Sequence, residues 1–287
     1  MKATLLLLLA GTPACAQSTI NSTNRYAWSG NTGWINWRDA NGGLQGVVVT
    51  EFFCFGSLWS ANCGWISFGT ATPANGWRFT NTDSADCGVN HDGAGKLRGY
   101  AWGPNIGWVI FEDTGSPRID LATGRLSGHA WAPNIGWINL GTATAFVQTD
   151  HILSNRDTDA DGISDSWELM HTGDVILLSD RTDTDGDGTG DLAEYRAGTD
   201  PLDPLDLLRI VDLSVLLAGG AQTTLSWTSR PTRFYRIKDW TGEAGSVWKL
   251  TLDNIAPAAG ATTTRTATTS GMPRRLYRVE AFRPLSP

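Results

Sequence analysis

Charged residues are scarce in this chain: they make up 18% of its 287 residues, whereas hydrophobic residues make up 41%. This balance excludes an intrinsically disordered chain, which needs low hydrophobicity and high net charge. Ala, Glu, Lys and Leu do not dominate the composition, which excludes a coiled coil or helical bundle. The formal net charge of −7 argues against nonspecific binding to nucleic acid or to an anionic membrane.

Long apolar runs are also rare, and the one clear run lies at the N-terminus. Ala3–Gly11 follows Lys2 and contains five consecutive leucines, and Ala14-Cys15-Ala16 then supplies the small residues that a signal peptidase reads. We predict a signal peptide over 1–16, with lipidation at Cys15 as the second interpretation. No later run is long enough for a membrane span, so we expect an exported protein, in the periplasm, outside the cell or on its surface.

Cysteine is too sparse for a disulfide scaffold. After removal of residues 1–16 three cysteines remain, Cys54, Cys63 and Cys87, so that at most one internal bridge can form. Cys54 and Cys63 are close in sequence, with a turn-like Gly-Ser between them, and we favour that pair. No Cys-x-x-Cys or Cys/His spacing supports zinc.

Catalytic motifs are missing as well. None of the four histidines stands in a nucleophile-elbow, metalloprotease or Cys-His context, and no glycine-rich stretch is followed by the helix that a phosphate loop needs. We interpret His91-Asp92 as a turn with a surface histidine. A glycosidase would need two facing carboxylates, and the spacing favours no pair among Glu51, Glu112, Asp113 and Asp120. We therefore expect no enzyme.

What the chain does have is tryptophan, 14 residues, ten of them before residue 142. A template W-x-x-N-x-G-W-[IV] begins at Trp28, Trp59, Trp102 and Trp131, with spacings of 31, 43 and 29 residues. Each unit predicts two short strands joined by a turn that carries the Asn and the Gly. We predict an all-β domain over 17–150, a β-meander of four units in a closed or stacked arrangement that protects edge strands.

The paired tryptophans allow two interpretations. In the first, Trp and Ile fill the core between units, since a large ring buries much area. In the second, the rings bind a ligand such as a glycan, with repetition supplying avidity. One Trp of each unit could be core and the other exposed, and the Asn is interpreted as a turn residue. The candidate ligand-binding residues are Trp28, Trp34, Trp59, Trp65, Trp102, Trp108, Trp131 and Trp137.

An acidic segment follows, and residues 157–203 hold 12 Asp and two Glu against two Arg. Two twelve-residue loops, beginning at Asp157 and Asp183, place carboxylates at positions 1, 3, 5, 9 and 12 and Gly at position 6. This spacing is typical of a calcium loop, in which position 7 contributes a backbone carbonyl. The pattern predicts about two Ca²⁺ ions, and the predicted ligands are Asp157, Asp159, Asp161, Ile163, Asp165, Glu168, Asp183, Asp185, Asp187, Thr189, Asp191 and Glu194.

The loops depart from an EF-hand in two ways. Position 8 is Ser164 or Gly190 where an apolar residue would pair the loops, and the stretch before the first loop is too short for an incoming helix. Outgoing helices are predicted over 165–171 and 191–197. The segment therefore resembles bacterial thrombospondin type-3-like repeats, and the resemblance implies a stalk or spacer, within 151–205, that calcium orders.

Residues 206–287 read as six strands, 207–217, 222–228, 233–239, 247–252, 262–268 and 274–282, separated by Gly/Pro/Ser turns. This predicts a β-sandwich. Leu225-Ser-Trp227, Phe234-Tyr-Arg-Ile237 and Leu276-Tyr-Arg-Val279 resemble a fibronectin type-III-like module, which implies a spacer or interaction domain.

The whole layout resembles a group of secreted bacterial proteins in which Ala-Trp-x-x-Asn-x-Gly-Trp-Ile repeats precede an Asp-rich calcium segment. The resemblance implies architecture and no activity. We expect a mainly β, secreted, calcium-binding modular protein that acts in binding or adhesion, with a glycan or a surface protein as partner. The alternatives are a purely structural envelope or matrix protein, with the Trp repeats as packing units, and a degenerate hydrolase.

Overall fold

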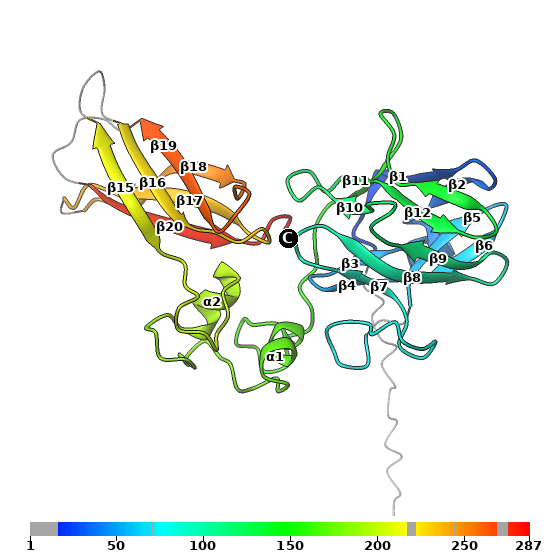
Figure 1. Cartoon of the computed structure of the whole chain (residues 1–287), viewed down its shortest axis with the longest axis horizontal. Coiled ribbons are helices and arrows are strands. Elements are labelled where there is room, and N and C mark those ends of the chain that lie inside the picture. The colour runs from blue at the N-terminus through cyan, green and yellow to red at the C-terminus, as the bar shows by residue number, and fades with distance from the viewer. Residues whose placement is uncertain (1–16, 70–71, 217–221, 244, 269–274) are drawn as a thin grey trace, which may run out of the picture.

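The computed structural model describes residues 17–69, 72–216, 222–243, 245–268 and 275–287. The predicted signal peptide with Cys15, and the predicted strand ends at Leu217 and Arg274, lie outside the described residues. The described chain forms a barrel, two short helices with the acidic loops, and a β-sandwich, with the helical segment between the other two (Figure 1). None of the helices in these residues is long and apolar enough to cross a membrane.

The four repeats form four hairpins that close into an eight-stranded barrel. Its strands follow the order β8-β6-β5-β2-β1-β13-β12-β9, and β9 returns to pair with β8. The hairpins are β1 (Ile20–Ser29) with β2 (Gly33–Asn36), β5 (Ser57–Ser60) with β6 (Gly64–Ser67), β8 (Leu97–Gly103) with β9 (Gly107–Phe111), and β12 (His129–Ala132) with β13 (Gly136–Asn139). The prediction of a closed arrangement is confirmed, and closure leaves these strands without a free edge.

Shorter elements decorate the barrel. Strands β3 (Val48–Val49), β4 (Phe53–Phe55) and β7 (Val89–His91) extend the sheet from β8, and β14 (Val147–Thr149) pairs with β1. A short hairpin between the third and fourth repeats consists of β10 (Arg118–Ile119) and β11 (Leu126–Ser127), and a 3₁₀ turn, η1, covers Ala40–Gly43.

The barrel interior is filled in layers, with one residue from each repeat in every layer. The β-branched residue after the second Trp of each repeat forms the first layer. The residue two places later forms a second layer of larger side chains, three of them aromatic. Rings of this second layer lie edge to face, with centroids 5.1 Å apart between Trp37 and Phe68. The layers are Ile35, Ile66, Val109 and Ile138, and Trp37, Phe68, Phe111 and Leu140.

Strand alternation then dictates where the repeat tryptophans lie. Because neighbours of the buried residues point to the opposite face, the paired Trp side chains lie on the outside of the barrel. Seven of the eight are exposed, between 38% for Trp108 and 51% for Trp34, and Trp131 is half-buried. The prediction that the paired tryptophans fill the core is therefore wrong, as is the suggestion of one core and one exposed Trp per unit. The Ile or Val beside them fills the core instead.

The favoured Cys54–Cys63 bridge is also absent, because Cys54, Cys63 and Cys87 are all free thiols. Cys54 lies on β4 and Cys63 in the β5–β6 turn, and β7 and β8 stand between β4 and β6 in the sheet order. Both thiols are buried in the barrel core. Burial raises the pKa of Cys54 to about 12, so this thiol is unreactive and contributes only to the packing of the core.

The C-terminal part consists of two three-stranded antiparallel sheets. One has the order β15 (Ile210–Leu216), β16 (Gln222–Thr228), β19 (Thr262–Thr268), and the other β18 (Lys249–Ile255), β17 (Phe234–Trp240), β20 (Leu276–Phe282). Leu225, Trp227, Tyr235 and Ile237 form the core between them. The six predicted strands are thus confirmed, with boundaries that differ by a few residues.

Candidate metal centre

The two acidic loops repeat one geometry, each leading into a seven-residue helix. Helix α1 (Asp165–His171) follows the first loop and α2 (Asp191–Ala197) follows the second, as predicted. In each loop the first three aspartates bring carboxylate oxygens within 4.8 Å of one another. These clusters are Asp157, Asp159 and Asp161, and Asp183, Asp185 and Asp187.

The first aspartate of each loop holds the loop backbone in its curve. Asp157 accepts from the amides of Ala160 and Gly162, at 2.7 and 3.0 Å. Asp183 accepts from Gly186 and Gly188, at 2.9 and 3.0 Å. The position-6 glycines, Gly162 and Gly188, both have φ of 94°, a conformation that favours glycine. The conformation of the loop backbone, as much as ion binding, therefore explains why both loops have Asp at position 1 and Gly at position 6.

The position-12 glutamates are buried without adequate partners. Glu168 and Glu194 both have 0% exposure, both Glu168 oxygens lack a hydrogen-bond partner among the described residues, and so does Glu194 Oε2. Burial, reinforced by the charges of nearby aspartates, raises the pKa of each carboxyl to about 8. Buried acceptors without donors are costly. A divalent cation would satisfy them.

Other unpartnered acceptors point to the same need. Asp161 Oδ2, Asp185 Oδ2 and Asp187 Oδ2 are buried and lack a partner among the described residues. Hard carboxylate oxygens in this number suit Ca²⁺, which takes six to eight oxygen ligands. The residues present therefore fit the ion that the sequence predicts.

The position-9 aspartates accept hydrogen bonds that the sequence did not predict. Asp165 accepts from the amide and hydroxyl of Thr158, at 2.7 and 2.6 Å. Asp191 accepts from the corresponding groups of Thr184, both at 2.9 Å. These carboxylates close the loop onto the start of its helix. The shared Asp-Thr-Asp at positions 1–3 was the available signal, because the threonine at position 2 offers both an amide and a hydroxyl donor.

The loops share a small core with the barrel. Ile163 and Leu178 pack with Trp167 of α1 and Tyr195 of α2, and Phe52 of the barrel packs against them. Ile163 is fully buried. Its side chain therefore anchors the loop, while its carbonyl remains the predicted position-7 ligand. Thr189 occupies the same position in the second loop and is half-buried.

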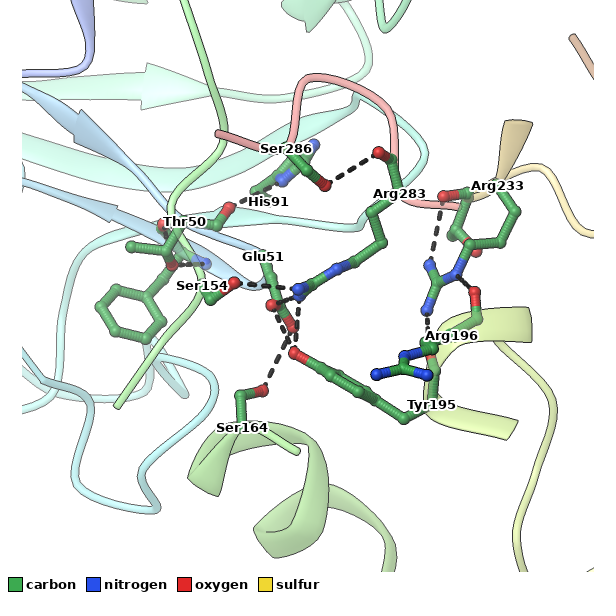
Figure 2. Close-up of polar contacts among 12 residues, drawn as sticks. Thr50, Glu51, His91, Ser154, Ser164, Tyr195, Arg196, Arg233, Arg283 and Ser286 are labelled. Carbon is green, nitrogen blue, oxygen red and sulfur yellow. Dashed lines mark hydrogen bonds and ion pairs between the residues drawn. The ribbon is translucent and has the colours of Figure 1, made fainter. Parts of the chain in front are cut away.

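A polar junction ties this segment to both neighbouring domains (Figure 2). Glu51 of the barrel, 7% exposed, accepts from the hydroxyls of Tyr195 at 2.8 Å and Ser164 at 3.2 Å. Arg283, just after β20, forms an ion pair with Glu51 and also donates to the Tyr195 hydroxyl at 2.6 Å. Arg233 of the sandwich donates to the Tyr195 carbonyl at 2.7 Å. Tyr195 of α2 thus contacts both domains.

A cleft of about 410 Å³ opens beside this junction. His91 lines it, and the prediction of a surface histidine is wrong: the ring ends β7, is 3% exposed, and lies with Nδ1 3.0 Å from the Thr50 carbonyl. Burial lowers the pKa of His91, which favours a neutral ring. The expected turn follows one residue later, where Asp92 accepts from the amides of Ala94 and Lys96.

The acidic segment also matches a known family. The family model for the bacterial TSP3 repeat matches residues 157–173 and 183–204. The predicted resemblance is confirmed for these residues, and the segment is a repeat of calcium-binding type. No curated protein and no solved structure matches the chain.

Proposed function

We propose that the barrel binds carbohydrate through its four Trp pairs, in a secreted protein whose calcium loops fix the barrel relative to the sandwich. One observation carries the proposal: the paired tryptophans lie on the outer wall and are largely exposed. Trp28 and Trp34, for example, are exposed by 40% and 51%. Exposed apolar rings in a repeated array are unfavourable for a monomer in water and mark interaction surfaces.

Each site has the components that a sugar needs. The two Trp residues of each pair lie opposite each other across the hairpin. In three of the pairs the rings pack edge to face, with centroids 4.7 Å apart in the first repeat and 4.9 Å in the third. A polar cross-strand pair lies next to the rings in three repeats: Tyr26 with Asn36, Ser57 with Ser67, and His129 with Asn139. In the third repeat Tyr100 lies opposite Ile110 at this position. Aromatic faces can stack on sugar rings, and the polar pairs can hydrogen-bond hydroxyls.

Fourfold repetition would add avidity. A polymer or a dense surface glycan that engages two sites at once binds more tightly than one site alone, without any new contact. Four hairpins around a closed barrel suit a ligand that is itself repetitive. We infer an extracellular adhesion role from this arrangement and from the TSP3 repeats, which are typical of extracellular proteins.

The test is a glycan array followed by calorimetry on the full chain. We expect Trp28→Ala with Trp34→Ala to reduce apparent affinity, and Trp→Ala at all four pairs to abolish it, while the circular dichroism spectrum stays unchanged. Trp248→Ala, at a 38% exposed Trp outside the barrel, is the matched control. Folded wild-type protein that binds no glycan on the array would refute the proposal.

A structural role is the second candidate, and the repeat turns favour it. The Asn of each turn bonds a neighbouring turn, for example Asn62 Nδ2 to the Thr32 carbonyl at 2.9 Å, and within three of the pairs the Trp rings contact each other. If the repeats serve only as packing units, each Trp→Ala pair should lower the melting temperature markedly, and no glycan should bind.

A further inference from the structure

The last strand of the sandwich has one free edge. Strand β20 pairs with β17 along all seven residues without a register shift, and no described strand pairs with its other edge. Natural edge strands are usually interrupted by bulges, prolines or lysines. The edge strand at the far side of this sheet, β18, has two such irregularities, whereas β20 contains neither a proline nor a lysine. Its backbone is therefore regular along all seven residues, although Arg278 and Glu280 place charges on the strand and helix α2 contacts it.

The opposite sheet is left uncovered beside the same edge. Leu213 and Val215 of β15 pair in register with Leu225 and Thr223, whose side chains are buried in the core. Leu213 and Val215 share that inner face, yet they are 47% and 49% exposed. The Thr223 hydroxyl lies 2.8 Å from the Tyr277 hydroxyl. Strand β20 thus lies opposite β16. The position opposite β15, at the free edge of β20, is occupied by no described strand.

The chemistry of β20 fits a second copy of itself. We propose that two chains associate by antiparallel pairing of their β20 strands, with Val279 opposite Val279 on the twofold axis. In this register Arg278 of one copy lies opposite Glu280 of the other, twice. On the same face Leu276 lies opposite Phe282, and on the inner face Tyr277 lies opposite Ala281. Opposite charges and apolar pairs directly across a ladder are stabilising, and such a twofold contact is closed.

Neighbouring registers are unfavourable. A twofold axis at residue 278 places two arginines opposite each other, and an axis at residue 280 places two glutamates opposite each other, which destabilises the ladder. A twofold axis that passes between two residues would place inner-face residues of one strand opposite outer-face residues of its partner. The Val279 register also places the inner face of the second copy's β20 over Leu213 and Val215, so that these exposed side chains become buried.

Charge reversal tests the register. Arg278→Glu places glutamates opposite each other in a homodimer, and Glu280→Arg places arginines opposite each other. Each variant alone should therefore dimerise at least about tenfold more weakly than the wild type. An equimolar mixture of the two restores both opposite-charge pairs and should dimerise as a heterodimer. The full chain would be followed by analytical ultracentrifugation over a concentration series, and circular dichroism would check that each variant is folded.

Lys249→Glu is the matched control, since it reverses a charge on the β18 edge of the same sheet. It should leave association unchanged. A wild-type chain that is monomeric at every concentration would overturn the proposal. So would single reversals that dimerise as well as wild type, or a mixture that fails to restore association. Amide hydrogen exchange supplies a second readout: dimerisation should protect amides on the free edge of β20.

Discussion

Asn31 of the first repeat donates its side-chain amide to the backbone carbonyl of Ile135 in the fourth, at 3.1 Å. The other three repeats make the same bond to the repeat before them, Asn62 to Thr32, Asn105 to Cys63 and Asn134 to Ile106, at 2.9 to 3.1 Å. Four equivalent bonds thus form a ring around one end of the barrel. The acceptor residues are all buried, and their side chains close that end.

Removing one bond of this ring should weaken the barrel modestly. We expect Asn62→Ala to lower the free energy of unfolding by about 1 kcal/mol, because the side chain is at the surface and water can replace the lost donor. Asn62→Asp should cost more, since a carboxylate then faces the Thr32 carbonyl. Urea denaturation measures both. Gly30→Ala, in open space in the first turn, is the control and should change little.

The buried glutamates predict a specific pH dependence. A carboxyl whose pKa rises from 4.5 in the unfolded chain to about 8 in the folded chain binds its proton more tightly when folded. Without calcium the folded state is therefore favoured below the unfolded pKa, and it loses stability as pH rises from 4.5 towards 8. Calcium displaces these protons. We expect melting temperature to fall with pH in EGTA, and this fall to be suppressed in saturating Ca²⁺.

The same linkage predicts proton release on calcium binding. Calorimetry near neutral pH, in buffers of different ionisation enthalpy, should show net release of protons to the buffer. Glu168→Gln should reduce both the release and the pH dependence, and should weaken binding at the first loop. A chain that binds Ca²⁺ without releasing protons would contradict either the raised pKa of these glutamates or their role as ligands.

The two loops differ at position 4, which gives a paired test of backbone strain. Ala160 has φ of 64° in the first loop, and Gly186 has φ of 78° in the second. A side chain in this region costs about 1 kcal/mol. Ala160→Gly should raise the calcium affinity or leave it unchanged, and Gly186→Ala should lower the calcium affinity. Because a Cβ at Gly186 would meet no atom within 4 Å, the loss would report backbone conformation alone. Equal effects of both changes would contradict this account.

Tyr195→Phe should loosen the junction between domains. The ring keeps its place in the small core, but Glu51 loses a hydrogen bond at 2.8 Å. We expect a loss of about 1–3 kcal/mol, because the acceptor is a buried carboxylate. Small-angle X-ray scattering should report a wider range of domain arrangements. Tyr277→Phe is the control, since its hydroxyl bond lies within the sandwich and its loss should leave the arrangement unchanged.

Local patterns in the sequence predict local structure well. The hairpins follow from W-x-x-N-x-G-W, both helices follow from their loops and stop signals, and spacing alone locates the two aspartate clusters. These features depend on residues within about a dozen positions of one another. The direction of the tryptophans could also have been read from alternation, because the Ile or Val after each second Trp must take the opposite face.

Contacts between distant residues could not be predicted in this way. Glu51 looked like an unplaced carboxylate, and its partners Ser164, Tyr195 and Arg283 come from three later segments. Asn62 looked like a turn residue, which it is, but its bond to the previous repeat depends on closure of the barrel. His91 ends a strand that the polar sequence around it concealed.

Closure also fixes how this domain can vary in length. A linear array of repeats can gain or lose a unit at either end, whereas a closed circle of hydrogen-bonded turns admits no fifth member without reshaping every other contact. Length must therefore vary between hairpins. The repeat spacings of 31, 43 and 29 residues follow this rule, since the longest interval accommodates β7 outside the barrel wall. Insertions in these connections should be tolerated, and duplication of a whole hairpin should not.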